Sequence, residues 1–493
     1  DSVWALIERY ASTDSRIKAV RRQVNGHIAA ASNSALALAT GDYVALLDHD
    51  DALHPLALQW CALGFERNPR WRMLFTDEDK IDTEGVRSDP YFKSDWNPDL
   101  FLSQNCVCHL AVYERELLDA IGGFREGVNG SQDWDLALRA TERLGADQIG
   151  HIQKVLYHWR IIEGSTALGA GEKTYAHGAG RQVIVDHLDR IGVNARVEER
   201  ADMRGHFHVV RAVDVPEPSV TLLIPTRDRV DLLKQCIDSI IERTTYENYE
   251  IVVLDNGSVE PETQAYLAKV TQRPNVRVLA YDAPFNYSKI NNFGAKHSSG
   301  QVIGLLNNDI EVISPGWLTE MVSHAMRKEI GVVGAMLYYP NDTIQHAGVV
   351  LGIGGVAGHS YVGVPRNYPG DKFRAKLVQN VSAVTAACAV VRREVFEAVG
   401  GLDEAIVVAF NDVDFCIRVR EAGYRNLWTP LAELYHHESA SRGYENTPEK
   451  VARFNGEVDF MLKRWGDLLK ADPYYNPNFT LSGTPFTLSY PPR

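Results

Sequence analysis

The feature that most constrains the fold of this 493-residue chain is an internal repeat. The segment GDYVALLDHDD from Gly41 resembles GQVIGLLNNDI from Gly300, which lies 259 residues further on. HLAVYERELLDAIGGF from His109 matches ACAVVRREVFEAVGGL from Ala387 at 7 of 16 positions, with a shift of 278 residues. Two later pairs of segments, DWDLALR with DVDFCIR and LYH with LYH, follow in the same order. Four ordered matches indicate that the chain contains two copies of one domain.

The repeat divides the chain into two domains, a connector and a tail. We expect the first domain in residues 1–165, a helical connector in 166–218, the second domain in 219–445, and a C-terminal helix with an irregular tail in 446–493. The second domain opens with a strand, a helix and a strand that have no counterpart in the first. A parallel sheet without its central strands would expose an unpaired apolar edge. We therefore expect the sequence to be a fragment whose parent continues upstream.

The pattern of apolar segments favours the α/β fold class. Short apolar runs such as VALL and VIGLL alternate with helical periodicity, which is typical of a mostly parallel, Rossmann-like sheet with helices on both faces. Ligands of such sheets bind beyond the carboxyl ends of the strands. The longest nearly apolar run has 11 residues and a bilayer span needs about 20, so we expect no transmembrane helix. The predicted helix at 448–469 lies against either the domain core or a membrane surface.

The charge and the cysteine content limit the class of protein. A net charge of −13 argues against a non-specific nucleic-acid binder, which is normally basic. Of the six cysteines only Cys106 and Cys108 are close in sequence, and their C-x-C spacing is not that of a zinc finger. We therefore expect buried, reduced thiols in a cytosolic protein that has no nucleic-acid partner.

Acidic and amide side chains follow an apolar strand in both copies. In the first copy Asp48 and Asp50 are two residues apart on extended backbone, so they point the same way and can bind one ion. The second copy has Asn307, Asn308 and Asp309 at this place, and its single carboxylate predicts a weaker hold on a metal. Hard oxygen ligands suit Mg²⁺ or Mn²⁺, with phosphate oxygens completing the shell. A solvated turn is the alternative, which the recurrence disfavours.

In each copy a helix begins with two aspartates, and an arginine follows the second of them after four residues. This spacing predicts an ion pair between the arginine and the second aspartate. The first aspartate, Asp133 or Asp412, is then left to act as a general base. An ordinary acidic first turn of a helix is the alternative. The predicted ion pairs are Asp135–Arg139 and Asp414–Arg418.

A histidine recurs late in each copy, as His158 and as His436 in the pair His436-His437. A neutral imidazole is a good Mn²⁺ ligand, and His437 is an alternative to His436. A lone histidine is more often an ordinary polar residue of the surface or core. Because the histidine recurs in both copies, the ligand role and the ordinary role are about equally supported. Residues that follow could contact phosphate or an acceptor. They are Ser439, Ser441 and Arg442.

The segments IPTRDR, DNGS, LLNNDI, FNDVDFCIR and LYHHESASRG together resemble the family 2 glycosyltransferases of the GT-A fold, over residues 219–443 and, for the shorter copy, 1–165. Two such domains in tandem are similar to bacterial enzymes that build O-antigen, capsule or other surface polysaccharides. The resemblance implies an inverting, metal-dependent transfer of rhamnose or another hexose from a dTDP- or UDP-sugar to a growing glycan. It also implies Mn²⁺ or Mg²⁺ as cofactor, a lipid-linked acceptor, and work in the cytoplasm at the inner face of the cell membrane.

The resemblance also assigns roles to residues at matching positions. The nucleotide-binding residues that it implies are Pro225, Thr226, Asp255, Asn292 and Asn307 in the second domain, and Asn33 and Asp48 in the first. The implied metal ligands are Asp309 and His436 in the second domain, and Asp50 and His158 in the first. The implied general bases are Asp412 and Asp133.

Two departures from the family pattern keep alternatives open. Asn307 and Asn308 stand where carboxylates are usual, and Asn411 stands where a glutamate is usual before Asp412. The second change leaves Asp412 and Asp414 both open as the base. Two further hypotheses are a catalytically silent pair of nucleotide- or glycan-binding domains, and an enzyme in which only the second domain is active.

Overall fold

A computed structural model of the chain describes residues 2–162, 174–437 and 447–493. Helices and strands alternate along it, and four neighbouring strands of one sheet run parallel, so the predicted α/β fold class is confirmed. Within these residues, no helix is both long and apolar enough to cross a membrane. The six cysteines, all of which lie in the described ranges, form no disulfide, and all except Cys108 are buried.

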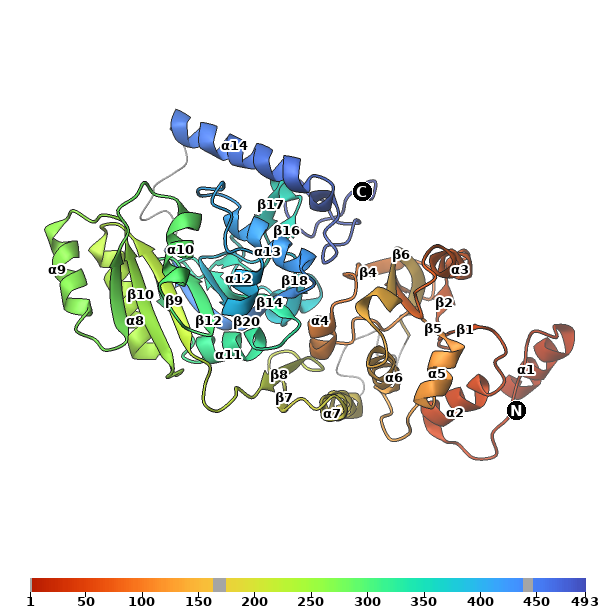
Figure 1. The fold of residues 1–493 in the computed structure, drawn as a ribbon. Coiled ribbons are helices and arrows are strands. Elements are labelled where there is room, and N and C mark those ends of the chain that lie inside the picture. The colour runs from red at the N-terminus through yellow and green to blue at the C-terminus, as the bar shows by residue number, and fades with distance from the viewer. Residues whose placement is uncertain (1, 163–173, 438–446) are drawn as a thin grey trace. The chain divides into compact units, whose positions relative to one another are not determined.

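The chain forms two compact units (Figure 1). Unit 1 comprises Asp1–Trp96 and Phe101–Val209, and unit 2 comprises Asn97–Leu100 and Val210–Arg493. Unit 2 therefore includes a short segment that comes from the middle of the unit 1 sequence.

Ten strands in the described part of unit 2 form one mixed sheet. Its first strands, β11, β10, β9 and β12, run parallel, and β19 then pairs antiparallel with both β12 and β14. β20 pairs parallel with β14 and antiparallel with β13, while β15 and β18 add to β14 and β20. A separate pair is formed by β16 and β17. The bounds are β9 Val220–Thr226, β10 Tyr249–Asp255, β11 Val276–Ala280, β12 Val302–Leu306, β13 Ile310–Val312, β14 Ile330–Tyr338, β15 Ile344–His346, β16 Val349–Leu351, β17 Ala357–His359, β18 Gln379–Val381, β19 Cys388–Arg392 and β20 Arg425–His436.

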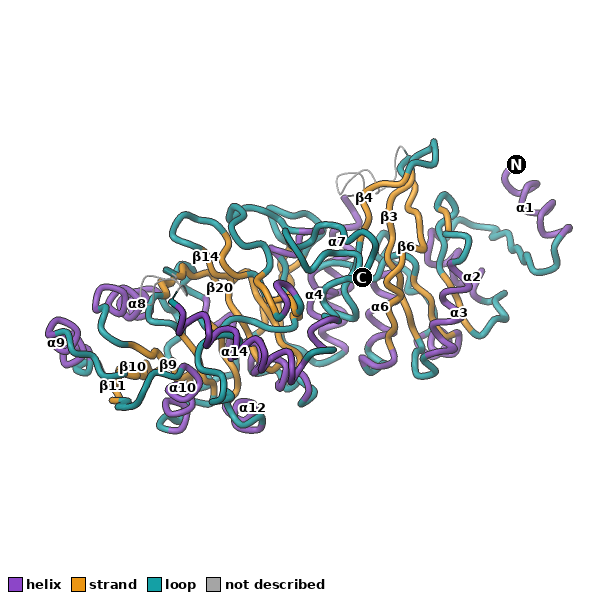
Figure 2. Tube along the Cα trace, turned by 90° about the horizontal axis from the view of Figure 1, so that it is seen from above, coloured by secondary structure: helices purple, strands orange, loops and turns teal. Residues whose placement is uncertain are grey.

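Helices cover both faces of this sheet, which explains why its strands β9, β10, β12, β14 and β19 are mainly apolar. In β12 the side chains of Ile303 and Leu305 enter one hydrophobic cluster, and those of Val302 and Leu306 enter the other. Figure 2 shows α8 and α10 on opposite sides of β9 and β10. The helices are α8 Val230–Arg243, α9 Pro261–Val270, α10 Tyr287–Lys296, α11 Trp317–Ala325, α12 Arg393–Ala398, α13 Asn411–Glu421 and α14 Pro448–Trp465.

Unit 1 has a smaller mixed sheet, of order β1-β5-β3-β6-β2, with β4 beside β3. Only its β3–β6 pair is parallel, so the expectation of a mostly parallel sheet is wrong for the described part of this unit. The reason is that no strand described in unit 1 corresponds to the parallel strands β9, β10 and β11. The strands are β1 Tyr43–Ala45, β2 Ala52–Leu53, β3 Met73–Ile81, β4 Arg87–Tyr91, β5 Ala111–Glu114 and β6 Ile149–Arg160, with a separate pair β7 Ala195–Glu199 and β8 Phe207–Arg211. The helices are α1 Ser2–Thr13, α2 His27–Leu36, α3 Ala57–Arg67, α5 Arg115–Ile121, α6 Gln132–Thr141 and α7 Thr174–Arg190. The residues of α4, Pro98–Ser103, are divided between the two units after Leu100.

Equivalent contacts occur in both units at positions that the repeat aligns. The Asn33 amide donates to the main-chain oxygen of Phe124 (2.8 Å) and accepts from its nitrogen (2.8 Å). In unit 2 the Asn292 amide makes the same two bonds with Leu402, each at 2.9 Å. Both asparagines therefore fasten a helix to a loop of their own unit.

Candidate active site

Polar side chains meet where the parallel strands of unit 2 end. After β12 the chain continues through Asn307, Asn308 and Asp309 into β13, whose Ile310 lies opposite His436 on β20. This pairing places His436 Nε2 3.3 Å from Asp309 Oδ1 and 3.2 Å from Asn307 Nδ2. The predicted carboxylate and imidazole therefore lie side by side.

These residues line a cavity of about 770 Å³ within unit 2. Among the predicted site residues, six contribute to its wall. They are Pro225, Thr226, Asn307, Asp309, Asp412 and His436. The Asn308 amide also lines it and donates to Thr226 Oγ1 at 3.1 Å, which ties the end of β12 to the end of β9.

Two of the residues predicted to bind nucleotide do not line this cavity. Asp255 Oδ1 accepts hydrogen bonds from the Ser258 nitrogen (3.0 Å) and hydroxyl (2.5 Å), while the neighbouring Asn256 reaches the cavity wall. The amide of Asn292 is engaged with Leu402 as described above. Both side chains thus bond to other residues of unit 2, and Asn256, the residue next to Asp255, lines the cavity.

The two aspartates at the start of α13 have different surroundings. Asp412 lines the cavity, where its Oδ2 accepts from the Ala386 nitrogen at 3.0 Å. Asp414 is fully buried, and its carboxylate contacts Arg418 (2.7 Å), Trp465 Nε1 (2.9 Å) and Arg464 (3.2 Å). Since Asp414 is enclosed by these partners, Asp412 is the aspartate that a bound substrate can reach.

The cavity offers a donor set that fits a divalent cation. Asp309 and His436 are each 5% exposed, and an oxygen and a nitrogen of theirs lie within 3.3 Å. His436 Nδ1 is buried and has no hydrogen-bond partner among the described residues. Carboxylate and imidazole ligands suit Mn²⁺. His437, the alternative ligand, lies 3.3 Å from Glu311 instead, and Ser439, Ser441 and Arg442 lie outside the described residues.

The C-terminal helix α14 supplies part of the cavity that the sequence pattern did not predict. Lys450, Arg453 and Phe454 line the wall. On the same helix, the buried Glu457 accepts hydrogen bonds from the main-chain nitrogens of Val407 and Val408 (2.8 Å each) and of Ala409 (3.1 Å). Helix α14, which is part of unit 2, therefore holds the loop that leads to Asp412. A signal in the sequence was the polar spacing of 450, 453 and 457, which places three charges on one helical face.

We expect Glu457→Gln to lower the free energy of unfolding of unit 2 by about 1–3 kcal/mol, because an amide leaves part of this set of buried main-chain donors unsatisfied. Chemical denaturation would measure the change, and donor binding should weaken in parallel because Val408 and Ala409 line the cavity. Glu449→Gln, at an exposed position of the same helix, is the matched control. Equal effects of the two substitutions would contradict this role of Glu457.

The predicted ligands of unit 1 are arranged differently. His158 Nδ1 lies 2.6 Å from Asp79 Oδ1, and Asp50 lies 3.7 Å from His49. His158 is paired with Ala52, whereas the repeat would place it opposite Asp51, as Ile310 faces His436. Because a shift of one residue turns a side chain to the other face of a strand, His158 does not take the place that His436 has in unit 2.

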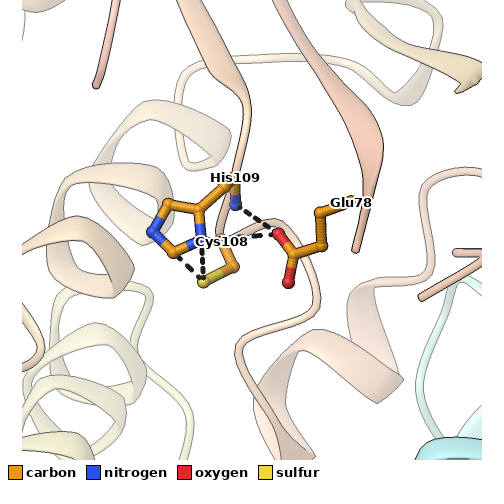
Figure 3. Close-up of side chains that lie close together, drawn as sticks. All are labelled: Glu78, Cys108 and His109. Atoms are coloured by element: carbon orange, nitrogen blue, oxygen red, sulfur yellow. Dashed lines mark hydrogen bonds and ion pairs between the residues drawn. The ribbon is translucent and has the colours of Figure 1, made fainter. Parts of the chain in front are cut away.

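Two other groups in the described part of unit 1 have ligand atoms close enough to share an ion, and neither includes Asp50 or His158. One is Glu78, Cys108 and His109 (Figure 3), and the other is Asp48, Asp51 and His109. Burial raises the pKa of Glu78, but the nearby Lys93 and His109 outweigh it and lower that pKa to about 2. His109 was not predicted, because the aligned position in the second copy holds Ala387.

The predicted base of unit 1, Asp133, accepts a hydrogen bond from the Asn105 amide at 2.7 Å. Burial raises the pKa of Asp133, and the lowering effect of His109 is smaller. A raised pKa is the direction that suits a proton acceptor near neutral pH.

A mixed α/β sheet with a polar cavity at the ends of its parallel strands defines a ligand-binding α/β protein. The chain belongs to glycosyl transferase family 2, whose pattern matches residues 1–122 and 221–400.

Similar proteins extend beyond the length of this chain. An uncharacterised protein, y4gI, of Sinorhizobium fredii is 48% identical over 491 residues, which cover 99% of this chain and 54% of that protein. The O-antigen biosynthesis protein RfbC of Myxococcus xanthus is 41% identical over 488 residues, covering 97% of this chain and 37% of that one. The chain thus spans about half, or less, of the length of these curated relatives.

A third relative matches a smaller share of the chain. It is an N-acetylglucosaminyl-diphospho-decaprenol L-rhamnosyltransferase of Mycobacterium tuberculosis, 26% identical over 237 residues, with coverage of 43% of this chain and 75% of that protein. Among solved structures, GalNAc-T7 with UDP, GalNAc and Mn²⁺ is 15% identical with a TM-score of 0.44, covering 54% of this chain and 51% of that one. Membership of the family therefore rests on sequence and not on these structural scores.

Proposed function

We propose that unit 2 transfers a sugar from a nucleotide-diphosphate sugar to a growing bacterial surface glycan, with inversion at the anomeric carbon. The observation that carries this proposal is that Asp309, His436 and Asp412 line one cavity at the carboxyl ends of the parallel strands. Membership of the glycosyl transferase family and the similarity to an O-antigen biosynthesis protein support it.

In this proposal each residue has a separate task. Asp412 accepts the proton of the acceptor hydroxyl as that oxygen attacks the anomeric carbon of the donor. Asp309 and His436 hold Mn²⁺ or Mg²⁺, which when bound would neutralise the charge of the departing nucleoside diphosphate. Thr226 and Asn308 line the part of the cavity that would receive the nucleotide, and Lys450 and Arg453 add positive charge from α14. Most of the catalytic effect is then positioning and electrostatic stabilisation.

The name of one relative suggests the transferred sugar and the acceptor. We propose that rhamnose or another hexose is transferred to a lipid-linked glycan. The dTDP- or UDP-linked form of the donor rests on the family resemblance alone. Transfer to such an acceptor would take place at the cytoplasmic face of the membrane. The same tasks in unit 1 would fall to Asp133 as base and to Asp48 on the nucleotide side.

The test is turnover of a panel of dTDP- and UDP-sugars with and without Mn²⁺, measured as release of the nucleoside diphosphate. We expect metal chelation to abolish release and added Mn²⁺ to restore it. Asp309→Asn should reduce Mn²⁺-supported turnover on the order of 100-fold, because the remaining ligands hold the ion poorly. Asp459→Asn is the matched control, since Asp459 is an exposed residue of the same unit and lies outside the cavity wall.

A specific observation favours a second function. Asn307 and Asn308 replace carboxylates beside Asp309, which weakens metal binding and suits a silent nucleotide- or glycan-binding module. Tight binding of a donor without release of nucleotide, at any Mn²⁺ concentration, would favour this module over the transferase. Release that persists unchanged in Asp309→Asn would contradict the assigned metal site.

A further inference from the structure

We propose that the strand pair β16–β17 forms a sugar-recognition wall in the cavity of unit 2, where His359 accepts a hydrogen bond from a sugar hydroxyl. This inference rests on the function proposed for unit 2 and names a residue that would select the sugar. Val349 of β16 and Ala357 and His359 of β17 line the cavity, as does Gln345 of the preceding strand β15.

The pair β16–β17 belongs to the second copy of the repeat alone. The shift between the copies grows from 259 to 278 residues between the end of β12 and the start of β19, so the second copy has an insertion there. Each copy first forms a hairpin, β3–β4 in unit 1 and β14–β15 in unit 2. The chain from β4 to β5, all of which is described, then contains only the helix α4, whereas unit 2 adds β16 and β17. The shared fold does not need this insertion, so its side chains can serve a ligand.

The inserted pair is fastened to the rest of unit 2. The Val349 nitrogen donates to the Ala383 main-chain oxygen at 2.9 Å. The Leu351 nitrogen donates to the carboxylate of Asp472 at 2.8 Å, and Asp472 is buried. Side chains that a fixed strand pair presents to a cavity are held in place before a ligand arrives, as precise recognition requires.

His359 presents a ring nitrogen whose role is defined. Its Nδ1 donates to the main-chain oxygen of Gln345 at 3.1 Å, which leaves Nε2 of the neutral ring as a hydrogen-bond acceptor. His359 is partly exposed, and Nε2 makes no hydrogen bond within the described residues. The ring also packs against the ring of His346, with centroids 4.8 Å apart and 76° between the planes. Because His346 is fully buried, it limits the movement of His359.

An uncharged hydroxyl fits this wall better than a phosphate or a cation. Burial, followed by the nearby His359 and His436, holds the pKa of His346 well below its ordinary value, so that ring brings no positive charge for a phosphate. Among the described residues, the groups of three side chains that could share a metal ion lie in unit 1, and none includes His359. A sugar hydroxyl supplies the neutral donor that Nε2 requires.

Aromatic side chains elsewhere on the cavity wall match the apolar face of a sugar ring. They are Phe285, Phe410 and Phe454, and the rings of the last two lie 5.6 Å apart. Phe410 has a φ of 63°, a left-handed conformation that is unfavourable for phenylalanine and that collects at ligand sites. Its counterpart in unit 1, Ser131, has a φ of −143°. Apolar rings with a few placed polar groups are typical of a small-molecule site.

The experiment measures binding to the full chain by calorimetry in the presence of Mn²⁺. The probes are dTDP-rhamnose and UDP-glucose, each compared with its bare nucleoside diphosphate, and octyl rhamnoside as an acceptor-like sugar. His359→Asn keeps a donor near the position of Nδ1 and removes the acceptor at Nε2. We expect it to weaken binding of a sugar probe about tenfold and to leave the affinity for bare nucleotide within about twofold.

Two further variants separate recognition from a structural role. His359→Gln places a polar amide near the position of Nε2 and should recover most of the lost affinity. His297→Asn is the matched control, because His297 is exposed, lies outside the cavity and also bonds a main-chain oxygen through Nδ1 (2.8 Å). It should leave every affinity unchanged.

The pattern of losses identifies which sugar His359 contacts. A loss confined to the nucleotide sugars indicates the sugar of the donor, and a loss confined to octyl rhamnoside indicates an acceptor. Unchanged binding of every sugar probe, an equal loss for bare nucleotide, or normal affinity in His359→Asn with a loss in His359→Gln would each overturn the inference. Any of these results in a protein that still releases nucleotide would leave the function proposed for unit 2 intact. A chain that binds none of the probes would overturn both.

Discussion

Replacing Asp412 with asparagine is expected to lower kcat for sugar transfer about 10²–10⁴-fold, because the amide cannot accept the acceptor proton. Donor affinity should change little, since the substitution removes an interaction that is needed mainly in the transition state. The fold should also persist, because an asparagine oxygen can still accept from the Ala386 nitrogen. Steady-state kinetics at saturating donor, together with calorimetric donor binding, would measure both effects.

The control for this prediction lies two residues further along the same helix. Asp414→Asn makes the same chemical change, but Asp414 is enclosed by Arg418, Arg464 and Trp465. We expect it to reduce stability, because it leaves buried arginine charge without its partner. A protein with Asp412→Asn and full turnover would show that another group accepts the proton.

The second large effect is expected for Asp99→Asn, which should destabilise unit 2 by about 3–5 kcal/mol because it leaves a buried cation without its partner. Asp99 is 3% exposed, lies 2.5 Å from Arg327 Nη1 and accepts from the Asn380 amide at 2.9 Å. Burial raises the pKa of Asp99, but Arg327 and other nearby arginines outweigh it and hold that pKa below its ordinary value. Chemical denaturation of the full chain, followed at the transition of unit 2, would measure the loss.

The lowered pKa of Asp99 also fixes the sign of a pH effect. A carboxyl group whose pKa is lower in the folded state stabilises the fold above its unfolded pKa of about 3.9 and loses this contribution as the pH falls toward the folded value. The difference in stability between the native protein and Asp99→Asn should therefore shrink on acidification below about pH 4. Glu329→Gln, which removes the half-exposed partner of Arg327, should cost at most about 1 kcal/mol. A cost similar to that of Asp99→Asn would contradict the buried pair as the cause.

The sequence predicted the centre of the site in unit 2 because that centre depends on local rules. Asp309 follows a buried strand and Asp412 begins a helix, so their places at the carboxyl edge of the sheet follow from the order of elements. Helix α14 was predicted with nearly the right bounds, and it packs on the domain core, which is one of the two partners expected for it. Helical periodicity gives the apolar face of a helix and does not say which loop its polar face will hold. Lys450 and Arg453 were missed for this reason.

The side chains of unit 1 that lie close enough to share an ion could not be predicted by comparing the two copies. The comparison transfers a role from His436 to His158 and assumes that both strands pair in the same register. The register of β2 with β6 depends on hydrogen bonds between distant segments, and a shift of one residue breaks the transfer. His109 was missed because it has no polar counterpart, since a residue that differs between two copies is invisible to a search for what they share.

Unit 2 depends on the short segment Asn97–Leu100, which comes from the middle of the unit 1 sequence. Asn97 exchanges two hydrogen bonds with the main chain of Asn380, each at 2.9 Å, and Asp99 neutralises Arg327. A recombinant product that starts at Val210 would lack these partners, so that Arg327 would keep Glu329 but lose its buried carboxylate. Expressing the two parts separately would therefore alter the structure of unit 2. Variants of the intact chain are the better way to assign an activity to either unit.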